Sequence, residues 1–99
     1  MKIFISQPMK DRTDEEILAE RNAAIEAAKK KLGEDVEPID SFFGTAPTGK
    51  KPLWFLAKSI ELMAEADVVI FCPGWEKARG CIIEHEAAVR YELKTYIVS

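Results

Sequence analysis

The sequence predicts an open α/β fold in which helices cover both faces of a parallel sheet. Short runs rich in β-branched and aromatic residues alternate with longer segments of helical periodicity, in the order strand, helix, strand, helix, strand, helix, strand. Residues 68–72 form a continuous apolar run, as expected for a parallel strand that is covered on both faces. With right-handed crossovers, these features predict a three-layer, flavodoxin-like sandwich whose four-stranded parallel sheet has the order 2-1-3-4.

The first strand and the first helix carry clear local signals. Residues 2–6 alternate in the manner of a short strand, which Gln7-Pro8 then breaks. Thr13 and the glutamate three positions later form a capping box, apolar residues recur at helical spacing, and Gly33 stops the helix. The first helix is therefore predicted over residues 14–32.

The second half of the chain supplies the remaining elements. Residues 36–40 are a weak strand interrupted by Pro38, so we expect that strand at an edge of the sheet, where a missing N–H is tolerated. Pro52 suits the first position of a second helix. Residues 81–93 are predicted to be the last helix, and residues 95–98 the last strand. The second helix is expected to bury one apolar stripe, formed by Leu53, Leu56, Ala57, Ile60 and Met63.

Length and composition predict a single globular domain, residues 1–99. Apolar residues make up 47% and charged residues 31% of the chain, which is typical of an ordinary soluble protein. No apolar run approaches the ~20 residues needed to cross a bilayer, and no signal peptide precedes the first strand. We therefore expect a cytoplasmic protein without a membrane partner.

Charge and cysteine usage narrow the choice of ligands. The net charge of -3 argues against nucleic acid as the main partner, because binding to its backbone relies on clustered Lys and Arg, although a small anion stays possible. Cys72 and Cys81 are the only cysteines and are expected to be reduced, core-filling thiols. Even with His85 they lack a fourth zinc ligand, so neither a metal nor a cofactor is predicted.

The loop within residues 72–86 is the strongest candidate for a functional site. It joins the buried third strand to the last helix and contains Gly74 and Gly80. In open α/β sheets ligands bind beyond the carboxyl ends of the strands, at the point where the strand order reverses. The order 2-1-3-4 places that point between the first and third strands, so residues 7–9 and 73–79 are expected to frame one pocket.

Glu84 is the candidate reactive group of this pocket. It lies about one turn into the predicted last helix, where the helix dipole and free N–H groups would hold a carboxylate ionised, as suits a nucleophile. The alternative is ordinary helix-end electrostatics, because acidic residues favour first turns in general. Glu86 and Arg90 are four positions apart and are expected to form an exposed pair.

Three other side chains have two interpretations each. Trp75 could offer a flat stacking surface to a ligand, or cover the core or a subunit interface. Arg79 could bind a phosphate or carboxylate, or be solvated. Arg21 falls on the apolar stripe of the first helix, which indicates a buried salt bridge or a reach toward the pocket.

Residues 44–51 match the glycine and lysine spacing of a phosphate-binding P-loop but not its chemistry. The last position, Lys51, should be Ser or Thr to hold magnesium, and Pro47 removes an N–H from the phosphate cradle. We therefore favour a mobile surface loop, in which Lys50 and Lys51 could still attract an anion.

Three segments, residues 4–9, 66–69 and 74–86, resemble the nucleoside 2-deoxyribosyltransferase-like superfamily. The similarity covers nearly the whole chain and is greatest to a small, often phage- or prophage-borne branch, of which residues 74–81 and 83–86 are typical. In characterised relatives a glutamate at the start of the last helix attacks the anomeric carbon of a nucleoside. Water or another base then resolves the glycosyl-enzyme.

The resemblance implies an N-glycosidase or deoxyribosyltransferase that acts on a nucleoside or nucleoside 5'-monophosphate, with Glu84 as nucleophile. It also implies that the loop after the first strand contacts the sugar or its phosphate, and that the protein is a homodimer or larger homo-oligomer. The candidate substrate-binding residues are Ser6, Gln7, Pro8, Met9, Arg12, Gly74, Trp75, Arg79 and Gly80.

Two positions depart from the family pattern. Relatives carry an aspartate in the helix before the third strand where this chain has Ser59, and many carry an acidic or serine residue where it has Ala78. Either Glu76 or another carboxylate replaces the missing acid, or the chemistry is altered or lost. Two alternatives to an enzyme follow: a non-catalytic nucleotide-binding module, and a phage-encoded interaction protein that uses the fold only as a scaffold.

Overall fold

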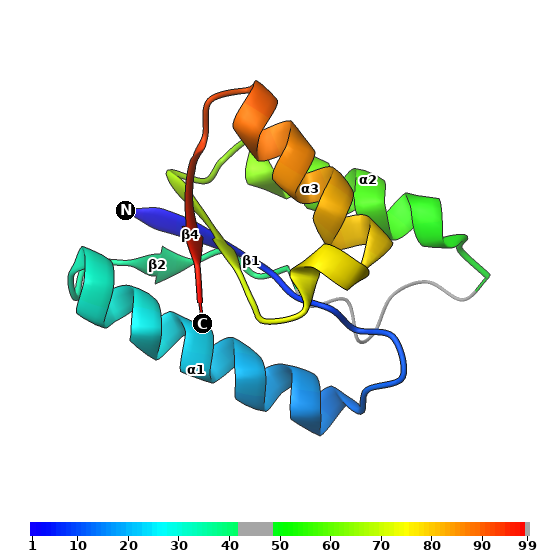
Figure 1. Cartoon of the computed structure of the whole chain (residues 1–99), viewed down its shortest axis with the longest axis horizontal. Helices are drawn as coiled ribbons and strands as arrows, with labels where there is room; N and C mark the ends of the chain where they lie inside the picture. The colour runs from blue at the N-terminus through cyan, green and yellow to red at the C-terminus, as the bar shows by residue number, and fades with distance from the viewer. Residues whose placement is uncertain (42–48, 99) are drawn as a thin grey trace.

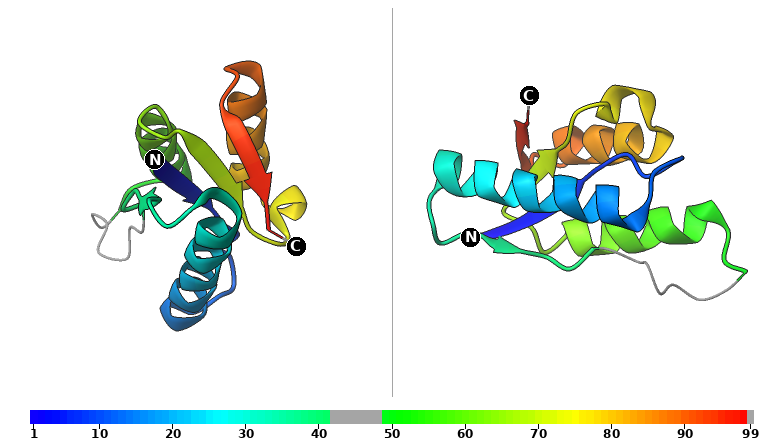
Figure 2. Two further views of the ribbon diagram at one scale, coloured as in Figure 1. Left: turned by 90° about the vertical axis from the view of Figure 1, so that its left-hand side faces the viewer. Right: turned by 90° about the horizontal axis from the view of Figure 1, so that it is seen from below.

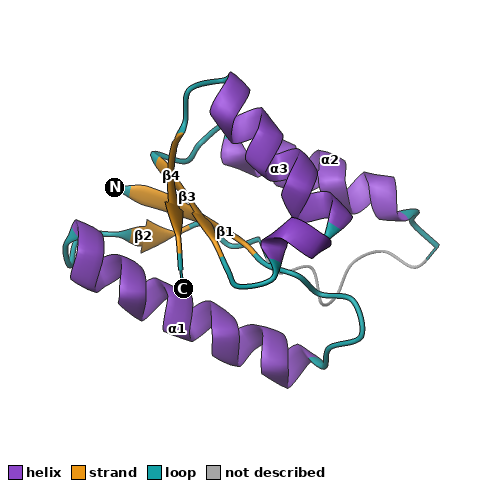
Figure 3. Ribbon diagram, viewed as in Figure 1, coloured by secondary structure: helices purple, strands orange, loops and turns teal. Residues whose placement is uncertain are grey.

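The computed structural model describes residues 1–41 and 49–98 of the chain. Helices and strands alternate along it, as Figures 1 and 3 show. The elements are β1 (Lys2–Ser6), α1 (Asp14–Leu32), β2 (Glu37–Pro38), α2 (Pro52–Met63), β3 (Val68–Phe71), the 3₁₀ helix η1 (Trp75–Lys77), α3 (Arg79–Arg90) and β4 (Lys94–Ile97).

The four strands form one parallel sheet in the order β2-β1-β3-β4, which confirms the predicted topology. The central pair is in register from Ile3 opposite Val68 to Ser6 opposite Phe71. Edge strand β2 is only two residues long and contains Pro38, in line with the expected edge position. The reversal of strand order therefore falls between β1 and β3.

Helices cover both faces of the sheet and divide the core into two layers (Figure 2). On the α1 side, Ile3, Ile5 and Ile70 pack with Ala24 and Ala28. The intervening strand residues face α2 and α3, where they pack in a second cluster, formed by Phe4, Val69, Phe71, Met63, Ala66 and Ala88. Because successive side chains of a strand point to opposite faces, a strand covered on both faces is apolar at every position.

Helix α1 begins and ends where the local signals predict. The Thr13 side chain accepts a hydrogen bond from the backbone N–H of Glu16, and the Glu16 carboxylate accepts one from the N–H of Thr13. Such a cap stabilises a helix by about 1 kcal/mol. At the other end, the N–H of Gly33 bonds to Lys29 while its φ of 117° takes the chain out of the helix.

Helix α3 is displaced toward the N-terminus relative to the predicted range 81–93. Ala78 has extended backbone angles and its carbonyl accepts the first helical hydrogen bond, from Ile82, so the helix begins at Arg79. It ends at Arg90 because Glu92 adopts a left-handed φ of 59°. Strand β4 accordingly starts one residue before the predicted position.

The prediction of a buried apolar stripe on the second helix is wrong. Among the residues of that stripe only Met63 is buried, while Leu53 is 71% exposed and Ile60 is 37% exposed. Figure 1 shows the reason: the first half of α2 extends past the ends of the strands, where no sheet lies beneath it. Its inner face there, at Phe55, Leu56 and Ser59, borders a cleft instead.

The P-loop-like segment 44–51 lies mostly outside the described residues, and Lys50 and Lys51 are exposed just before α2. No helix within residues 1–41 and 49–98 is long and apolar enough to cross a membrane.

Candidate functional site

A cleft of about 970 Å³ lies at the carboxyl ends of β1 and β3. Its walls come from the β1–α1 loop, the first half of α2 and the η1–α3 junction. The loops after the first and third strands thus border the same cleft, as the strand order predicts. They also approach each other, since a Cβ placed on Gly74 would lie 3.6 Å from Cγ of Pro8.

Glu84 is the buried carboxylate of this cleft. The residue is only 7% exposed, although it lines the cleft. The Ser6 hydroxyl, at the end of β1, donates a hydrogen bond of 2.6 Å to Glu84 Oε1. The Ser59 hydroxyl, on α2, also hydrogen-bonds the Glu84 side chain. Three elements therefore meet at one carboxylate.

Burial and hydrogen bonding have opposite effects on Glu84. Burial raises the pKa of the Glu84 carboxyl, because a charged carboxylate loses its hydration inside the protein. The hydrogen bonds from Ser6 and Ser59 lower that pKa in part, since both favour the ionised form. Glu84 is the sixth residue of α3, beyond the first turn in which the helix dipole acts strongly. The hydroxyls of Ser6 and Ser59 therefore stabilise the ionised carboxylate, a role that the sequence had assigned to the helix N-terminus.

Cys81 lies near this group of contacts. It is one turn before Glu84 on α3 and is 4% exposed, and the Ser6 side chain lowers the pKa of its thiol in part. Burial raises the pKa of the Cys81 thiol to about 11. Cys81 is therefore a buried, protonated thiol near the candidate reactive carboxylate, while the Ser6 hydroxyl has its hydrogen bond with Glu84.

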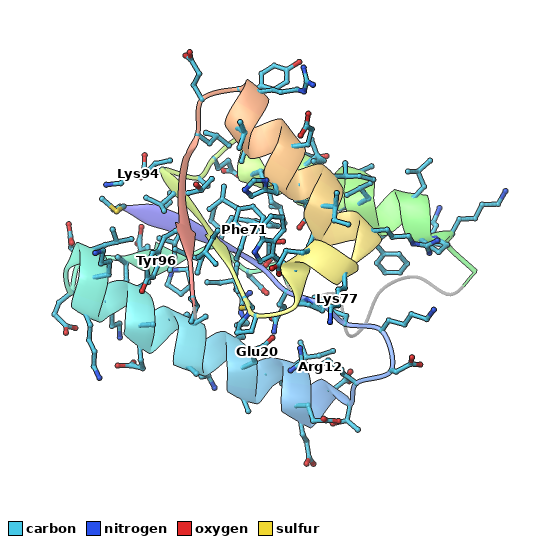
Figure 4. The ribbon with its side chains drawn as sticks, in the orientation of Figure 1. Arg12, Glu20, Phe71, Lys77, Lys94 and Tyr96 are labelled. Carbon is cyan, nitrogen blue, oxygen red and sulfur yellow. The ribbon has the colours of Figure 1, made fainter. Side chains whose placement is uncertain are left out.

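Gln7 and Arg12 line the cleft, but their side chains hold the β1–α1 loop. Gln7 Nε2 donates to the carbonyl of Ile17 at 3.0 Å and to Glu20 Oε1 at 3.1 Å. Arg12 Nη1 donates to the carbonyl of Pro8 at 2.8 Å and to the same Glu20 oxygen at 2.7 Å. Figure 4 shows Arg12 beside Glu20 at this loop. Glu20, which the sequence analysis missed, thus anchors two predicted binding residues.

Trp75 is not among the residues that line the cleft. Its ring stacks on His85, with ring centroids 4.2 Å apart, and lies tilted against Phe71 at 5.5 Å. His85 also meets Phe71 edge-on, at 5.0 Å. Of the two interpretations of Trp75, the structure favours a cover for the core, and it does not bring this residue to the other candidate site residues.

The mouth of the cleft carries an excess of positive charge. Lys10, Lys77 and Arg79 line it and are exposed, and none of them forms a salt bridge with an acidic residue of the described chain. The charged lining residues are Lys10, Asp11, Arg12, Asp14, Lys77, Arg79 and Glu84, four cations and three acids. Since the chain as a whole has a net charge of -3, this balance is local to the cleft.

The remaining candidates divide between cleft and core. Pro8, Met9, Gly74 and Gly80 line the cleft. Arg21 does not line it: its guanidinium donates to the Ser41 hydroxyl at 3.0 Å and to a backbone carbonyl at the end of β2. The exposed pair of Glu86 and Arg90 forms as predicted.

Ser59 and Ala78, the two positions at which the chain departs from the superfamily that it resembles, both line the cleft. Glu76, considered as a replacement acid, is exposed on η1 and is not a lining residue. The other carboxylates of the described lining are Asp11 and Asp14, both exposed on the β1–α1 loop side. Glu84 is therefore the buried acid of the described cleft. A second acid that takes part in catalysis would have to be Asp11 or Asp14, at the mouth of the described cleft.

Comparisons of the chain with protein-family models, with curated proteins and with solved structures find no match. The fold is thus established by its topology: a small α/β domain with a flavodoxin-like arrangement and the strand order 2-1-3-4.

Proposed function

We propose that the protein is an N-glycosidase or deoxyribosyltransferase of the nucleoside 2-deoxyribosyltransferase-like kind, acting on a nucleoside or nucleoside 5'-monophosphate. The observation that carries this proposal is Glu84, a buried carboxylate held by two hydroxyls from separate elements at the base of an open cleft. A carboxylate fixed in this way is suited to nucleophilic attack on a sugar carbon. The position of the cleft, at the reversal of strand order, is where α/β sheets bind ligands.

In the proposed reaction an oxygen of Glu84 attacks the anomeric carbon and forms an ester bond with the sugar. The bond from that carbon to the base breaks, and the base leaves with the bonding electron pair and takes up a proton. Water, or the nitrogen of a second base, then attacks the same carbon and releases Glu84 as a carboxylate. Two displacements at one carbon give overall retention of configuration.

Two properties of the cleft support a nucleotide as the ligand. Its volume of about 970 Å³ is at the upper end of the range for small-molecule sites, which is roughly 300–1,000 Å³. The cations at its mouth, Lys10, Lys77 and Arg79, would attract a phosphate group. Their charge supports a nucleoside 5'-monophosphate over an unphosphorylated nucleoside.

The test is chromatographic detection of free base after incubation with nucleosides, deoxynucleosides and their 5'-monophosphates. Glu84→Gln removes the nucleophile with little change in shape and should abolish base release. Glu86→Gln is the matched control, because Glu86 is exposed on the same helix and pairs with Arg90. Base release that survives Glu84→Gln would contradict the proposed mechanism.

A non-catalytic nucleotide-binding module is the second candidate, favoured by the absence of a second buried acid beside Glu84 in the described cleft. Ser59, where relatives carry an aspartate, donates a hydrogen bond to Glu84 and cannot replace a general acid at neutral pH. Calorimetric binding of a nucleotide without base release would support this candidate. A scaffold for protein–protein contacts would instead bind no nucleotide.

The cellular setting and the assembly stay predictions. We propose a cytoplasmic location, where Cys72 and Cys81, both free thiols, would stay reduced. We also propose a homodimer or larger assembly, as the family resemblance implies. Sedimentation of the purified protein at several concentrations tests the assembly.

A further inference from the structure

We propose that Ser6 is a positioning residue for Glu84: its buried hydroxyl, at the end of β1, donates to Oε1 and orients the carboxylate. The catalytic value of this arrangement depends on the proposed function of Glu84, whereas the arrangement itself can be tested without any substrate.

The position of Ser6 follows from the pleat of β1. Phe4, two residues earlier, packs in the cluster that faces α2 and α3, so Ser6 points to the same face. Ser6 is 1% exposed and its hydroxyl contacts Glu84, which is 78 residues away in the sequence. Burying a serine this completely at the end of an apolar strand would lower the stability of the fold if its hydroxyl had no hydrogen-bond partner. Glu84, the partner of this hydroxyl, comes from α3.

The direction of this bond follows from counting protons. A serine hydroxyl has one proton to donate, and an ionised carboxylate can only accept. The proton of Ser6 is therefore donated to Glu84 Oε1, across 2.6 Å.

No charged side chain of the described residues takes over the role of Ser6. The groups that face Glu84 are Ser6 from β1, Ser59 from α2 and Cys81 from its own helix. Burial, Ser6 and Ser59 are the causes of the shift in the pKa of Glu84. Lys77 and Arg79 line the same cleft from the η1–α3 junction, and Lys10, Asp11, Arg12 and Asp14 from the β1–α1 side. The lining cations and acids are not among the causes of that shift.

Removal of the Ser6 hydroxyl should therefore leave burial opposed by Ser59 alone. The pKa of Glu84 should rise, and the carboxylate should lose the contact that orients Oε1.

The experiment is a pH titration by NMR of protein labelled with ¹³C at the glutamate carboxyl carbons, with the Glu84 signal assigned from Glu84→Gln. In Ser6→Ala we expect the Glu84 midpoint to move to higher pH, and in Ser6→Thr, which keeps a hydroxyl, to stay near the wild-type value. Cys72→Ala is the matched control for loss of a small buried group, because Cys72 is buried in the cluster on the α1 side of the sheet. The Glu84 midpoint should not move in that variant.

An unchanged Glu84 midpoint in Ser6→Ala would overturn the role of Ser6. An upward shift in Cys72→Ala as large as that in Ser6→Ala would overturn it as well, because the shift would then not report the loss of the hydroxyl. If Ser6→Ala does not fold, Ser6→Cys supplies a weak donor of similar size and should give an upward shift, and its absence would count against the proposal in the same way.

Where base release is observed, activity supplies a second readout. The acidic limb of the kcat/KM profile should move to higher pH in Ser6→Ala, with a loss at neutral pH of about tenfold to a hundredfold and recovery in Ser6→Thr. If no substrate is cleaved by the wild type, the proposed function fails while the titration still decides the role of Ser6.

Discussion

The indole ring of Trp75 stacks on the imidazole ring of His85, with centroids 4.2 Å apart and an angle of 23° between the planes. Both rings also contact Phe71, the last residue of β3. The pair thus covers the core on the α3 side, beside the cleft. Trp75, which the sequence suggested as a stacking surface for a ligand, is therefore a packing residue.

Truncation of Trp75 should therefore affect stability more than binding. We expect Trp75→Ala to lower the free energy of unfolding by roughly 2–3 kcal/mol, because it removes a half-buried aromatic ring and its stacking contacts. Trp75→Phe should retain most of this stability. Urea unfolding measures the stability, and the KM for any substrate measures the binding. A large rise in KM at unchanged stability would contradict the packing role.

Glu20 should control the β1–α1 loop, since one of its carboxylate oxygens accepts hydrogen bonds from both Gln7 and Arg12. Glu20→Ala is expected to cost roughly 1 kcal/mol of stability and to weaken ligand binding through the loosened loop. Glu26→Ala is the control: Glu26 is an exposed glutamate on the same helix, paired with Lys29. Equal effects of the two substitutions on ligand affinity, measured by calorimetry, would show that Glu20 has no special role.

The raised pKa of Glu84 predicts a definite dependence of stability on pH. Where the folded state holds this proton and the unfolded state has released it, stability falls as pH rises. The window begins near the ordinary value of 4.5 and ends at the higher pKa of the folded state. The wild type should therefore lose stability relative to Glu84→Gln between these two values. Urea unfolding at half-unit pH steps tests this, and a difference that does not vary with pH would refute it.

The two cysteines should react slowly with thiol reagents in the folded protein. Burial raises the pKa of Cys72 to about 12 and that of Cys81 to about 11, so neither supplies much thiolate at pH 8. We expect a disulfide reagent to modify both only in urea, with a rate that follows unfolding. Fast modification of Cys81 in native buffer would indicate that the packing around the first turn of α3 opens readily.

The cations at the cleft mouth should distinguish phosphorylated from unphosphorylated ligands. Substitution of both Lys77 and Arg79 by Ala is expected to weaken binding of a nucleoside 5'-monophosphate about threefold to tenfold, and binding of the nucleoside much less. Lys94→Ala on β4, whose side chain is not among those lining the cleft, is the control (Figure 4). Equal losses for both ligands would argue against a phosphate at this position.

The sequence predicted the limits of α1 because these depend on short-range signals, and it predicted the topology because alternating strands and helices with right-handed crossovers leave few parallel arrangements. The capping box at Thr13, the stop at Gly33 and the apolar run of β3 each act within a few residues. The buried stripe of α2 could not be predicted in the same way. Periodicity shows that a helix has an apolar face, but Leu53 is exposed because the helix extends beyond the sheet that would have covered it.

The sequence by itself determined which loops meet at the cleft, since the strand order brings the ends of β1 and β3 together, and it singled out Glu84. Only the tertiary structure decided the surroundings of that carboxylate: Ser6 and Ser59 as its donors, Glu20 as the anchor of the loop, and His85 as the partner of Trp75. A hydrogen bond requires two atoms within about 3 Å. Such distances between residues far apart in the chain depend on how all three layers pack, which no local pattern encodes.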